Sequence, residues 1–329
     1  MRLPLLCVLA AALALGGAAP AAQHKTFRVG LVTEPQGVNV PIYRLMRDGL
    51  EHAVRELGVQ GKVLTPSPRE GYLPSFLSLA RQNYDLVIAP AGTQIQALDA
   101  AAQRFPRTHF VLLDNPHEAL PHRPKNVTAV AFAEQEVGYL TGYLAALMEN
   151  RRPGKHVISS VGGFKYPPVN RFIAGYQAGA RRADPRITTL NSYTFDFLDR
   201  AKCRQAALAQ IAKGSGVVFQ VAGARGLGAL EAAKEKGVWG IGVDIDQSSL
   251  GKHILTSARK RLDVAVFDAV REATRGRFGG GRTKILRLRD RALDLGRISA
   301  KVPRSFVARI ERIRRQIVSG GIVVPTTVR

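Results

Sequence analysis

Short apolar runs alternate with longer amphipathic segments along most of this chain. In the first half, runs typical of buried strands occupy residues 27–32, 84–89 and 110–113. Between them, apolar side chains recur every three or four residues in segments 43–57 and 93–105, which predicts two helices. Strands that alternate with helices are typical of a parallel sheet covered by helices on both faces.

The same pattern recurs in the second half of the chain. Predicted strands and helices alternate again, in the order 157–161, 170–183, 217–221, 227–236 and 239–243. In each half a glycine follows one predicted strand and an aspartate ends a later one. The spacing along the chain between Gly92 and Asp114 is nearly the same as that between Gly223 and Asp244. We interpret the two halves as a duplicated α/β lobe.

Two further strand-like segments connect the predicted lobes. They occupy residues 126–132, which a helix over 136–148 follows, and residues 253–257. Two crossings predict a hinge, and ligands of such folds bind beyond the carboxyl ends of the parallel strands. The predicted first lobe comprises residues 25–128 plus about 255–285. The second comprises residues 129–252 plus part of 286–329.

The first 22 residues differ from the rest of the chain. Arg2 is followed by an almost wholly apolar stretch and then by small residues with Pro20, which is the pattern of a secretory signal peptide. A membrane anchor is the alternative, but the apolar stretch is shorter than the roughly 20 residues that span a bilayer. Cys7 comes too early to resemble a lipoprotein cleavage site. We therefore expect a protein that is exported to the periplasm or to the outer face of the plasma membrane.

Composition narrows the possible functions. The chain has 329 residues, and 46% of them are hydrophobic, a fraction typical of globular proteins. Its two cysteines are too few for a disulfide framework or a Cys-cluster metal site. The formal net charge is +23, and residues 251–329 hold 20 Lys and Arg against 6 Asp and Glu. A predicted helix over 303–319 contributes many of these arginines. The arginines of this helix can simply face solvent, which is the interpretation we favour, or they can bind anionic lipid. Aromatic residues that would stack on nucleic-acid bases are missing.

Polar residues and glycines follow the predicted strands and form the candidate site. Acids end three of the strands, at Glu34, Asp114 and Asp244, where they can accept hydrogen bonds from a ligand or act as turn residues. Other residues that follow the strands include Gly37, Asn39, Gly92, Gly162, Gly163, Gly223 and Gly226. The loop from Gly223 has the spacing G-x-x-G-x-G and not that of a dinucleotide fingerprint.

The sequence contains no recognisable catalytic constellation. The histidines are scattered, and the closest pair, His117 and His122, lies in a Pro-rich loop. Cys203 lies in a helical stretch without an evident base, so we interpret it as a packed thiol. Neither an enzyme, a metal site nor a cofactor is predicted.

The chain resembles the basic membrane protein family, the PnrA-like substrate-binding proteins of ABC transporters, over nearly all of residues 27–325. Several short motifs carry the resemblance through their order and spacing. They are GLVTEPQGVN (30–39), FAEQEVGYL (132–140), VGG (161–163), RFIAGYQAG (171–179), EAAKEKG (231–237), IGVDIDQ (241–247) and LTSARKRLD (255–263).

The resemblance implies a type I periplasmic-binding-protein fold, in which two Rossmann-like lobes joined by a hinge close on a ligand, usually a purine nucleoside. It implies that Tyr43 and Phe195, with Phe197 as a competitor for the second position, sandwich the base. Glu34 and Asp114 match the acids that meet the base, and the ribose partners match Gly223, Asp244 and Lys260. Carboxylates accept from hydroxyls and an ammonium donates, which suits a ribose diol.

The sequence departs from the family pattern around the base. Glu34 stands where the family has an aspartate, and Val40 stands where it has a second acid. Tyr43 replaces a phenylalanine. Arg44 and Arg225 add positive charge. Further substitutions are Gln36 for glycine and Ile42 for serine. We expect a monomeric binding protein that delivers a nucleoside-like ligand to the permease of an ABC importer. The alternative is a sensor or regulator that uses the same cleft for a different small molecule.

Overall fold

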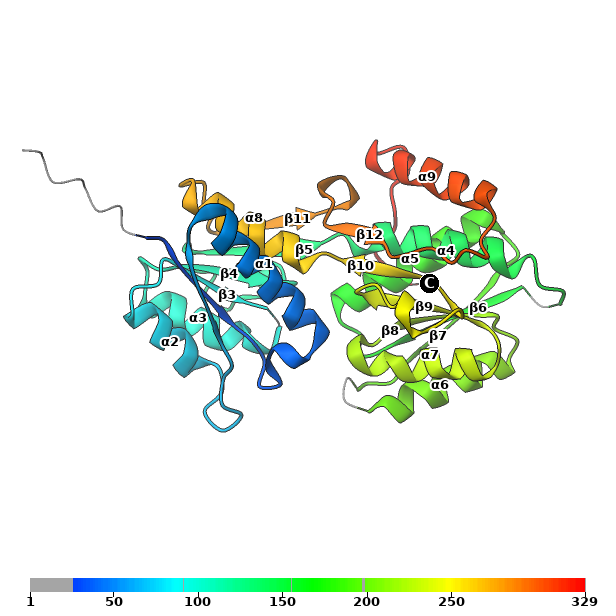
Figure 1. The fold of residues 1–329 in the computed structure, drawn as a ribbon, viewed down its shortest axis with the longest axis horizontal. Coiled ribbons are helices and arrows are strands. Elements are labelled where there is room, and N and C mark those ends of the chain that lie inside the picture. Colours follow the sequence, from blue (N-terminus) through cyan, green and yellow to red (C-terminus); the bar gives the residue numbers. More distant parts are fainter. Residues whose placement is uncertain (1–25, 91, 155, 197–198, 329) are drawn as a thin grey trace, which may run out of the picture.

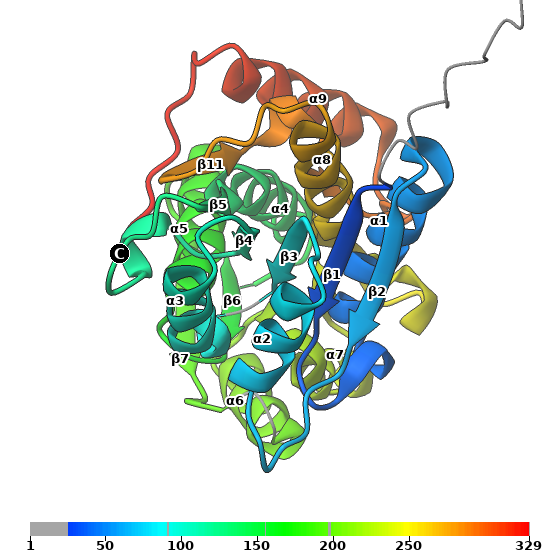
Figure 2. The same ribbon diagram turned by 90° about the vertical axis from the view of Figure 1, so that its left-hand side faces the viewer.

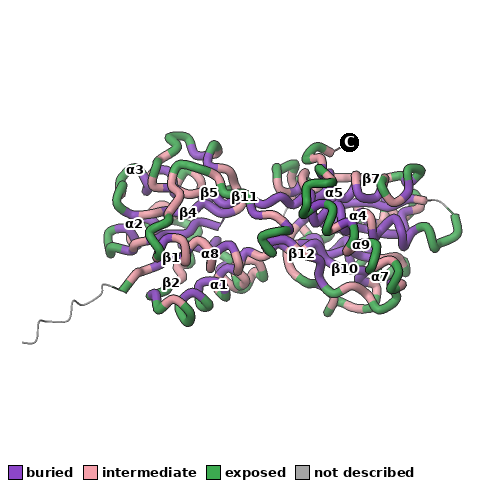
Figure 3. Tube along the Cα trace, turned by 90° about the horizontal axis from the view of Figure 1, so that it is seen from above, coloured by how far each residue is buried: buried purple, intermediate pink, exposed green. Residues whose placement is uncertain are grey.

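The computed structural model describes residues 26–90, 92–154, 156–196 and 199–328. The predicted signal peptide with Cys7, and the competing aromatic Phe197, lie outside these residues. The described chain forms two lobes side by side along the long axis of the molecule (Figure 1). Figure 3 shows buried residues inside each lobe and in the segments that connect the two.

The first lobe is built on a six-stranded parallel sheet. Its strand order is β11-β5-β4-β3-β1-β2, and the bounds are β1 Arg28–Val32, β2 Gln60–Leu64, β3 Leu86–Ala89, β4 His109–Leu113, β5 Val127–Phe132 and β11 Arg282–Leu286. Four helices cover it, namely α1 Pro41–Leu57, α2 Leu73–Arg81, α3 Ile95–Arg104 and α8 Leu262–Thr274. Helices α1 and α8 pack together on one face and α2 and α3 on the other (Figure 2), so the central strands are buried on both sides.

The second lobe repeats this architecture. Its strand order is β12-β10-β9-β8-β6-β7, and the bounds are β6 Val157–Gly162, β7 Thr188–Tyr193, β8 Val217–Val221, β9 Trp239–Asp244, β10 Ile254–Lys260 and β12 Leu293–Leu295. All the strand pairs are parallel except β10 with β12. The helices are α4 Glu134–Glu149, α5 Pro167–Ala183, α6 Arg200–Ala212, α7 Leu227–Glu235 and α9 Arg304–Val318. Two lobes with parallel sheets confirm the predicted fold class.

Glycines allow α4 and α5 to pack with their backbones in contact. A Cβ atom on Gly138 would lie 2.3 Å from the carbonyl oxygen of Phe172, and one on Gly175 would lie 2.0 Å from that of Gln135. No side chain fits at these distances, so the glycines in the two motifs are required by close helix packing.

The chain passes between the lobes three times. It crosses from β5 to α4 at Ala133, from β10 to α8 at Arg261, and from β11 toward β12 at Arg287. The sequence predicted two connecting segments, and the lobe bounds predicted with them place a return to the second lobe near residue 286, where the third crossing lies. Strand β10 also continues the second sheet as far as Lys260, which places this lysine at the junction of the lobes.

Candidate ligand-binding site

The acids at the strand ends occupy equivalent places in the two lobes. Asp114 follows β4 of the first sheet and Asp244 ends β9 of the second, and both have a φ angle of +64°. This left-handed conformation is tolerated by Asp better than by most residues and turns the chain sharply after the strand. Both carboxylates therefore lie at the carboxyl edge of their sheets, as the sequence predicted.

An ion pair joins the lobes at this edge. The Nζ atom of Lys260, in the second sheet, lies 2.8 and 2.7 Å from the two carboxylate oxygens of Asp114, in the first sheet. It also lies 3.6 Å from Oε1 of Glu134, and the lysine is only 3% exposed. The rings of Phe132 and Phe172 lie within 6 Å of the ammonium. Lys260 is thus a buried cation surrounded by carboxylates and aromatic faces.

The charges of this cluster depend on one another. Burial lowers the pKa of Lys260, but Asp114, Glu134 and Asp244 more than offset this effect and raise it above its ordinary value, so the ammonium stays charged. Burial raises the pKa of Asp244, while Lys260 acts in the opposite direction. Among the described residues, the Asp244 carboxylate accepts no hydrogen bond, so it is available to a ligand.

Glu134 completes the cluster from the first turn of α4. It is fully buried, and burial raises its pKa to about 7 although Lys260 opposes the shift. Arg171 on α5 donates to Oε2 at 2.6 Å, whereas Oε1 has no hydrogen-bond partner. A carboxyl whose pKa is higher in the folded than in the unfolded chain binds its proton more tightly when folded.

Glu134→Gln should therefore flatten the pH dependence of stability. The Glu134 carboxyl makes the wild type less stable as pH rises from its ordinary pKa of 4.5 toward 7, because the unfolded chain releases the proton first. Urea unfolding at pH 5, 6 and 7 measures this slope. The variant should lose less stability across that interval than the wild type, and equal slopes would contradict the role given to Glu134.

A second cluster lies at the end of β1. The hydroxyls of Tyr72 and Thr93 donate to the two carboxylate oxygens of Glu34, one to each, and Glu34 is 9% exposed. Burial and the nearby Glu34 raise the pKa of Tyr72 to about 12 and also raise that of Tyr43. Both phenols are thus neutral at ordinary pH. The two hydroxyl donors hold the Glu34 carboxylate in one orientation.

The sequence did not predict Tyr72 and Thr93 as residues of the site. Thr93 directly follows the strand-end glycine Gly92, so its position beside a predicted site residue could have indicated it. Tyr72 precedes α2, a short helix that the hydrophobic pattern did not predict, and nothing in the sequence connects it to Glu34. The distance between them along the chain is 38 residues.

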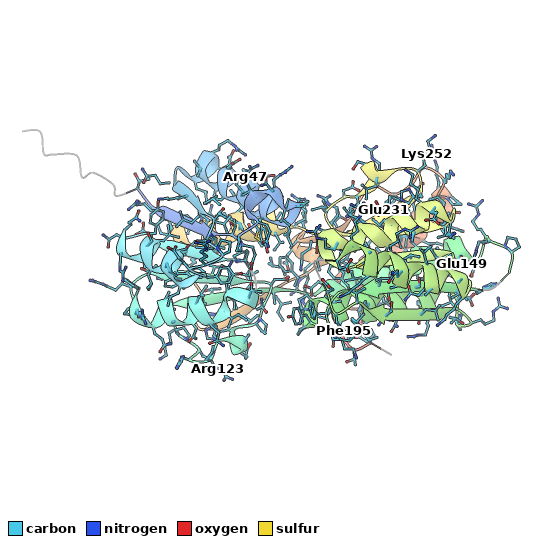
Figure 4. The ribbon with its side chains drawn as sticks, turned by 90° about the horizontal axis from the view of Figure 1, so that it is seen from below. Arg47, Arg123, Glu149, Phe195, Glu231 and Lys252 are labelled. Atoms are coloured by element: carbon cyan, nitrogen blue, oxygen red, sulfur yellow. The ribbon has the colours of Figure 1, made fainter. Side chains whose placement is uncertain are left out.

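The aromatic residue predicted from the second lobe is exposed. Phe195 follows β7, is 59% exposed and has a φ angle of +52°. Its ring lies 6.2 Å from that of Tyr193, and the Lys165 ammonium lies within 6 Å of both rings. Figure 4 shows Phe195 on the side of the second lobe nearest the first. Among the described residues no ring contact joins Phe195 to Tyr43, and the sandwich of a base between them stays a prediction.

The remaining candidates lie on the loops that follow the strands. Gly223 begins a short helical turn after β8 with a φ angle of +56°, which glycine adopts without strain, and Arg225 in the same turn is exposed. Asn39 is exposed at the end of a turn before α1. Two cavities, of about 450 and 360 Å³, lie elsewhere, beside α8 and at the end of α9, and none of the predicted ligand residues lines them.

Comparison with known proteins identifies the family. Residues 27–327 match the family model described as ABC transporter substrate-binding protein PnrA-like, named Bmp. The chain belongs to this family. The resemblance seen in the sequence motifs is thereby confirmed, and the protein is a substrate-binding protein of the ABC-transporter class. Such proteins bind small molecules and deliver them to a membrane permease.

Relatives of this Bmp protein cover most of its length. It is 30% identical to a CD4+ T-cell-stimulating antigen of Listeria monocytogenes, over 92% of this chain and 88% of the relative. It is 29% identical to the ABC transporter nucleoside-binding protein BmpA of Lactococcus lactis, over 91% and 89%. An uncharacterized lipoprotein of Pyrococcus horikoshii is 31% identical over 71% of this chain and 60% of the relative.

Solved structures confirm the type I binding-protein fold of this Bmp protein. An ABC transporter solute-binding protein from Aeropyrum pernix K1 superposes with a TM-score of 0.75 at 25% identity, over 91% of this chain and 94% of the other. A transcriptional activator of the comK gene from Bacillus halodurans gives a TM-score of 0.78 at 20% identity, over 91% and 99%. The second likeness concerns the fold alone. Among the described residues, no helix combines the length and the apolar character needed to cross a bilayer.

Proposed function

We propose that this Bmp protein is exported, acts outside the cytoplasm as a monomer, and binds a nucleoside or a closely related molecule for an ABC importer. One observation carries the nucleoside proposal. The Asp244 carboxylate is half-buried, unpartnered among the described residues, and close enough to Lys260 for the ammonium to affect its pKa. An acceptor beside a donor suits the neighbouring hydroxyls of a ribose. The name of the Lactococcus relative supports the same ligand class.

The remaining candidate residues are suited to contact the base of a nucleoside. The Glu34 carboxylate, held by Tyr72 and Thr93, is an acceptor for base N–H groups on the first lobe. The exposed Phe195 ring on the second lobe offers a face for stacking once the lobes close. Contacts from both lobes to one ligand favour the closed arrangement over the open one. Relatives named as lipoproteins support the extracytoplasmic location.

The described residues support binding better than catalysis. Cys203 is buried and burial raises the pKa of its thiol, which makes it a poor nucleophile. His117 is buried, and its Nε2 atom lies 3.1 Å from the carbonyl oxygen of Pro124. The Nδ1 atom of His122 lies 2.6 Å from a carboxylate oxygen of Asp99. No enzymatic step is proposed. A sensor role is supported only by a likeness of fold, so we propose the importer role.

Calorimetric titration tests the ligand class. The exported protein, freed of bound ligand by unfolding and refolding, is titrated with nucleosides, free bases and pentoses. We expect micromolar or tighter binding of nucleosides and much weaker binding of free bases, because the ribose contacts are then lost. A folded protein that releases no heat with any nucleoside would overturn the nucleoside proposal and leave the family and fold intact.

Tyr72→Phe combined with Thr93→Val should change base selectivity. The Glu34 carboxylate accepts only, so it suits a base edge with two adjacent N–H donors, as in guanosine, better than adenosine, whose edge pairs a donor with an acceptor. Without its two hydroxyl donors the carboxylate is no longer held, and we expect guanosine to bind about tenfold more weakly. Adenosine should change by less.

Thr93→Ser is the matched control, since it keeps the hydroxyl that donates to Glu34. It should bind guanosine as the wild type does. If the double variant and the control bind guanosine equally well, the hydroxyls do not set selectivity.

A further inference from the structure

Helix α9 forms an outer edge of the second lobe. It lies at the same edge of the molecule in Figures 1 and 2, and it packs against α4. Its buried side is apolar, with Ile310, Ile313 and Ile317 in the core. The helix is therefore fixed to the lobe through one face and leaves its other face to the surroundings.

The outward face of α9 is cationic. Arg304, Arg309, Arg312 and Arg315 are all exposed and, within the described part of the chain, have no ion-pair partner. The single acid of the helix, Glu311, lies 3.4 Å from Arg314, which also pairs with Asp294 at 2.8 Å. Four such charges on one helix form a local positive field.

Apolar side chains lie at the end of the same helix. Val318 is 43% exposed and Val323, in the segment that follows α9, is 90% exposed. We define the α9 surface as the four arginines, Arg304, Arg309, Arg312 and Arg315, with Val318 and Val323. Arginines beside exposed aliphatic side chains are typical of surfaces that lie on membranes, where charge meets the headgroups and apolar groups enter below them.

We propose that the α9 surface binds the anionic lipid surface of a membrane. This proposal goes beyond ligand binding, because none of the candidate ligand residues belongs to the surface. Each basic residue near an anionic bilayer strengthens binding several-fold, so four together strengthen it on the order of a hundredfold or more. The α9 surface has no exposed aromatic side chain to stack on bases, which favours lipid over nucleic acid.

Vesicle sedimentation tests the proposal. Exported protein is mixed with vesicles of phosphatidylcholine alone or with 30% phosphatidylglycerol, at low and at near-physiological salt. The test variant is R304Q/R309Q/R312Q/R315Q. The matched control, R55Q/R81Q/R104Q/R107Q, removes the same charge from exposed arginines of the first lobe. A third variant, V318S/V323S, removes the apolar component.

We expect the wild type to bind the anionic vesicles and to bind them less as salt rises. The α9 variant should bind them at least tenfold more weakly, the control within about twofold of the wild type, and V318S/V323S several-fold more weakly. Equal losses in the α9 variant and the control would overturn the proposal, because net charge alone would then explain binding. Equal binding to neutral vesicles, or tighter binding to duplex DNA than to anionic vesicles, would also overturn it.

Discussion

Replacing Lys260 with methionine should lower the free energy of unfolding by about 3–5 kcal/mol, the cost typical of removing one partner from a buried ion pair. Methionine keeps the bulk of the side chain, so the loss is chiefly electrostatic. Asp114, Glu134 and Asp244 would remain near one another without the cation that offsets their desolvation. Urea unfolding followed by circular dichroism measures the change.

A double variant separates charge from packing in this result. Asp114→Asn removes the carboxylate that contacts Lys260 at 2.7 Å, so K260M/D114N should be less destabilised than the sum of the two single changes. The deficit of K260M should also be smaller at pH 4 than at pH 7, because the stranded carboxyl groups can then take up protons. A pH-independent deficit and additive single changes would show that packing, not charge, explains the loss.

The central strands could be predicted from the sequence because they are buried on both faces. Strand β3 consists wholly of buried apolar residues, and such strands appear as continuous apolar runs. The edge strands β2 and β7 are largely exposed or half-buried and contain residues such as Lys62 and Asn191, so no apolar run marks them. Pairing with one neighbour, and not burial, determines their conformation.

The site was partly predictable for a related reason. Asp114 and Asp244 directly follow apolar runs, and the carboxyl ends of parallel strands meet at one edge. The pairing of Lys260 with Asp114 spans 146 residues, and local pattern carries no information on such a contact. The resemblance placed these two residues at different parts of the ligand, and the structure joins them directly. Glu134 lies in the motif FAEQEVGYL, but nothing in the sequence shows that it is buried beside a cation.

Asp244→Ala should weaken nucleoside binding by about 2–4 kcal/mol, the worth of one or two hydrogen bonds to a charged group. We expect no comparable loss of stability. Burial raises the pKa of Asp244, so its charge costs free energy in the folded protein, and the described residues give its carboxylate no hydrogen bond that the substitution would remove. Binding and stability therefore separate at this position, whereas both should fall in K260M.

Titration calorimetry and urea unfolding on the same Asp244→Ala preparation give the two values. Asp244→Asn is the companion variant: it keeps the shape and one acceptor but loses the charge, so its affinity should fall between those of the wild type and the alanine variant. A loss of affinity below about threefold in Asp244→Ala would place the ribose elsewhere. A large loss of stability would instead show that Asp244 is a structural partner of Lys260. Its carboxylate would then not be free for a ligand, and it would no longer support a nucleoside.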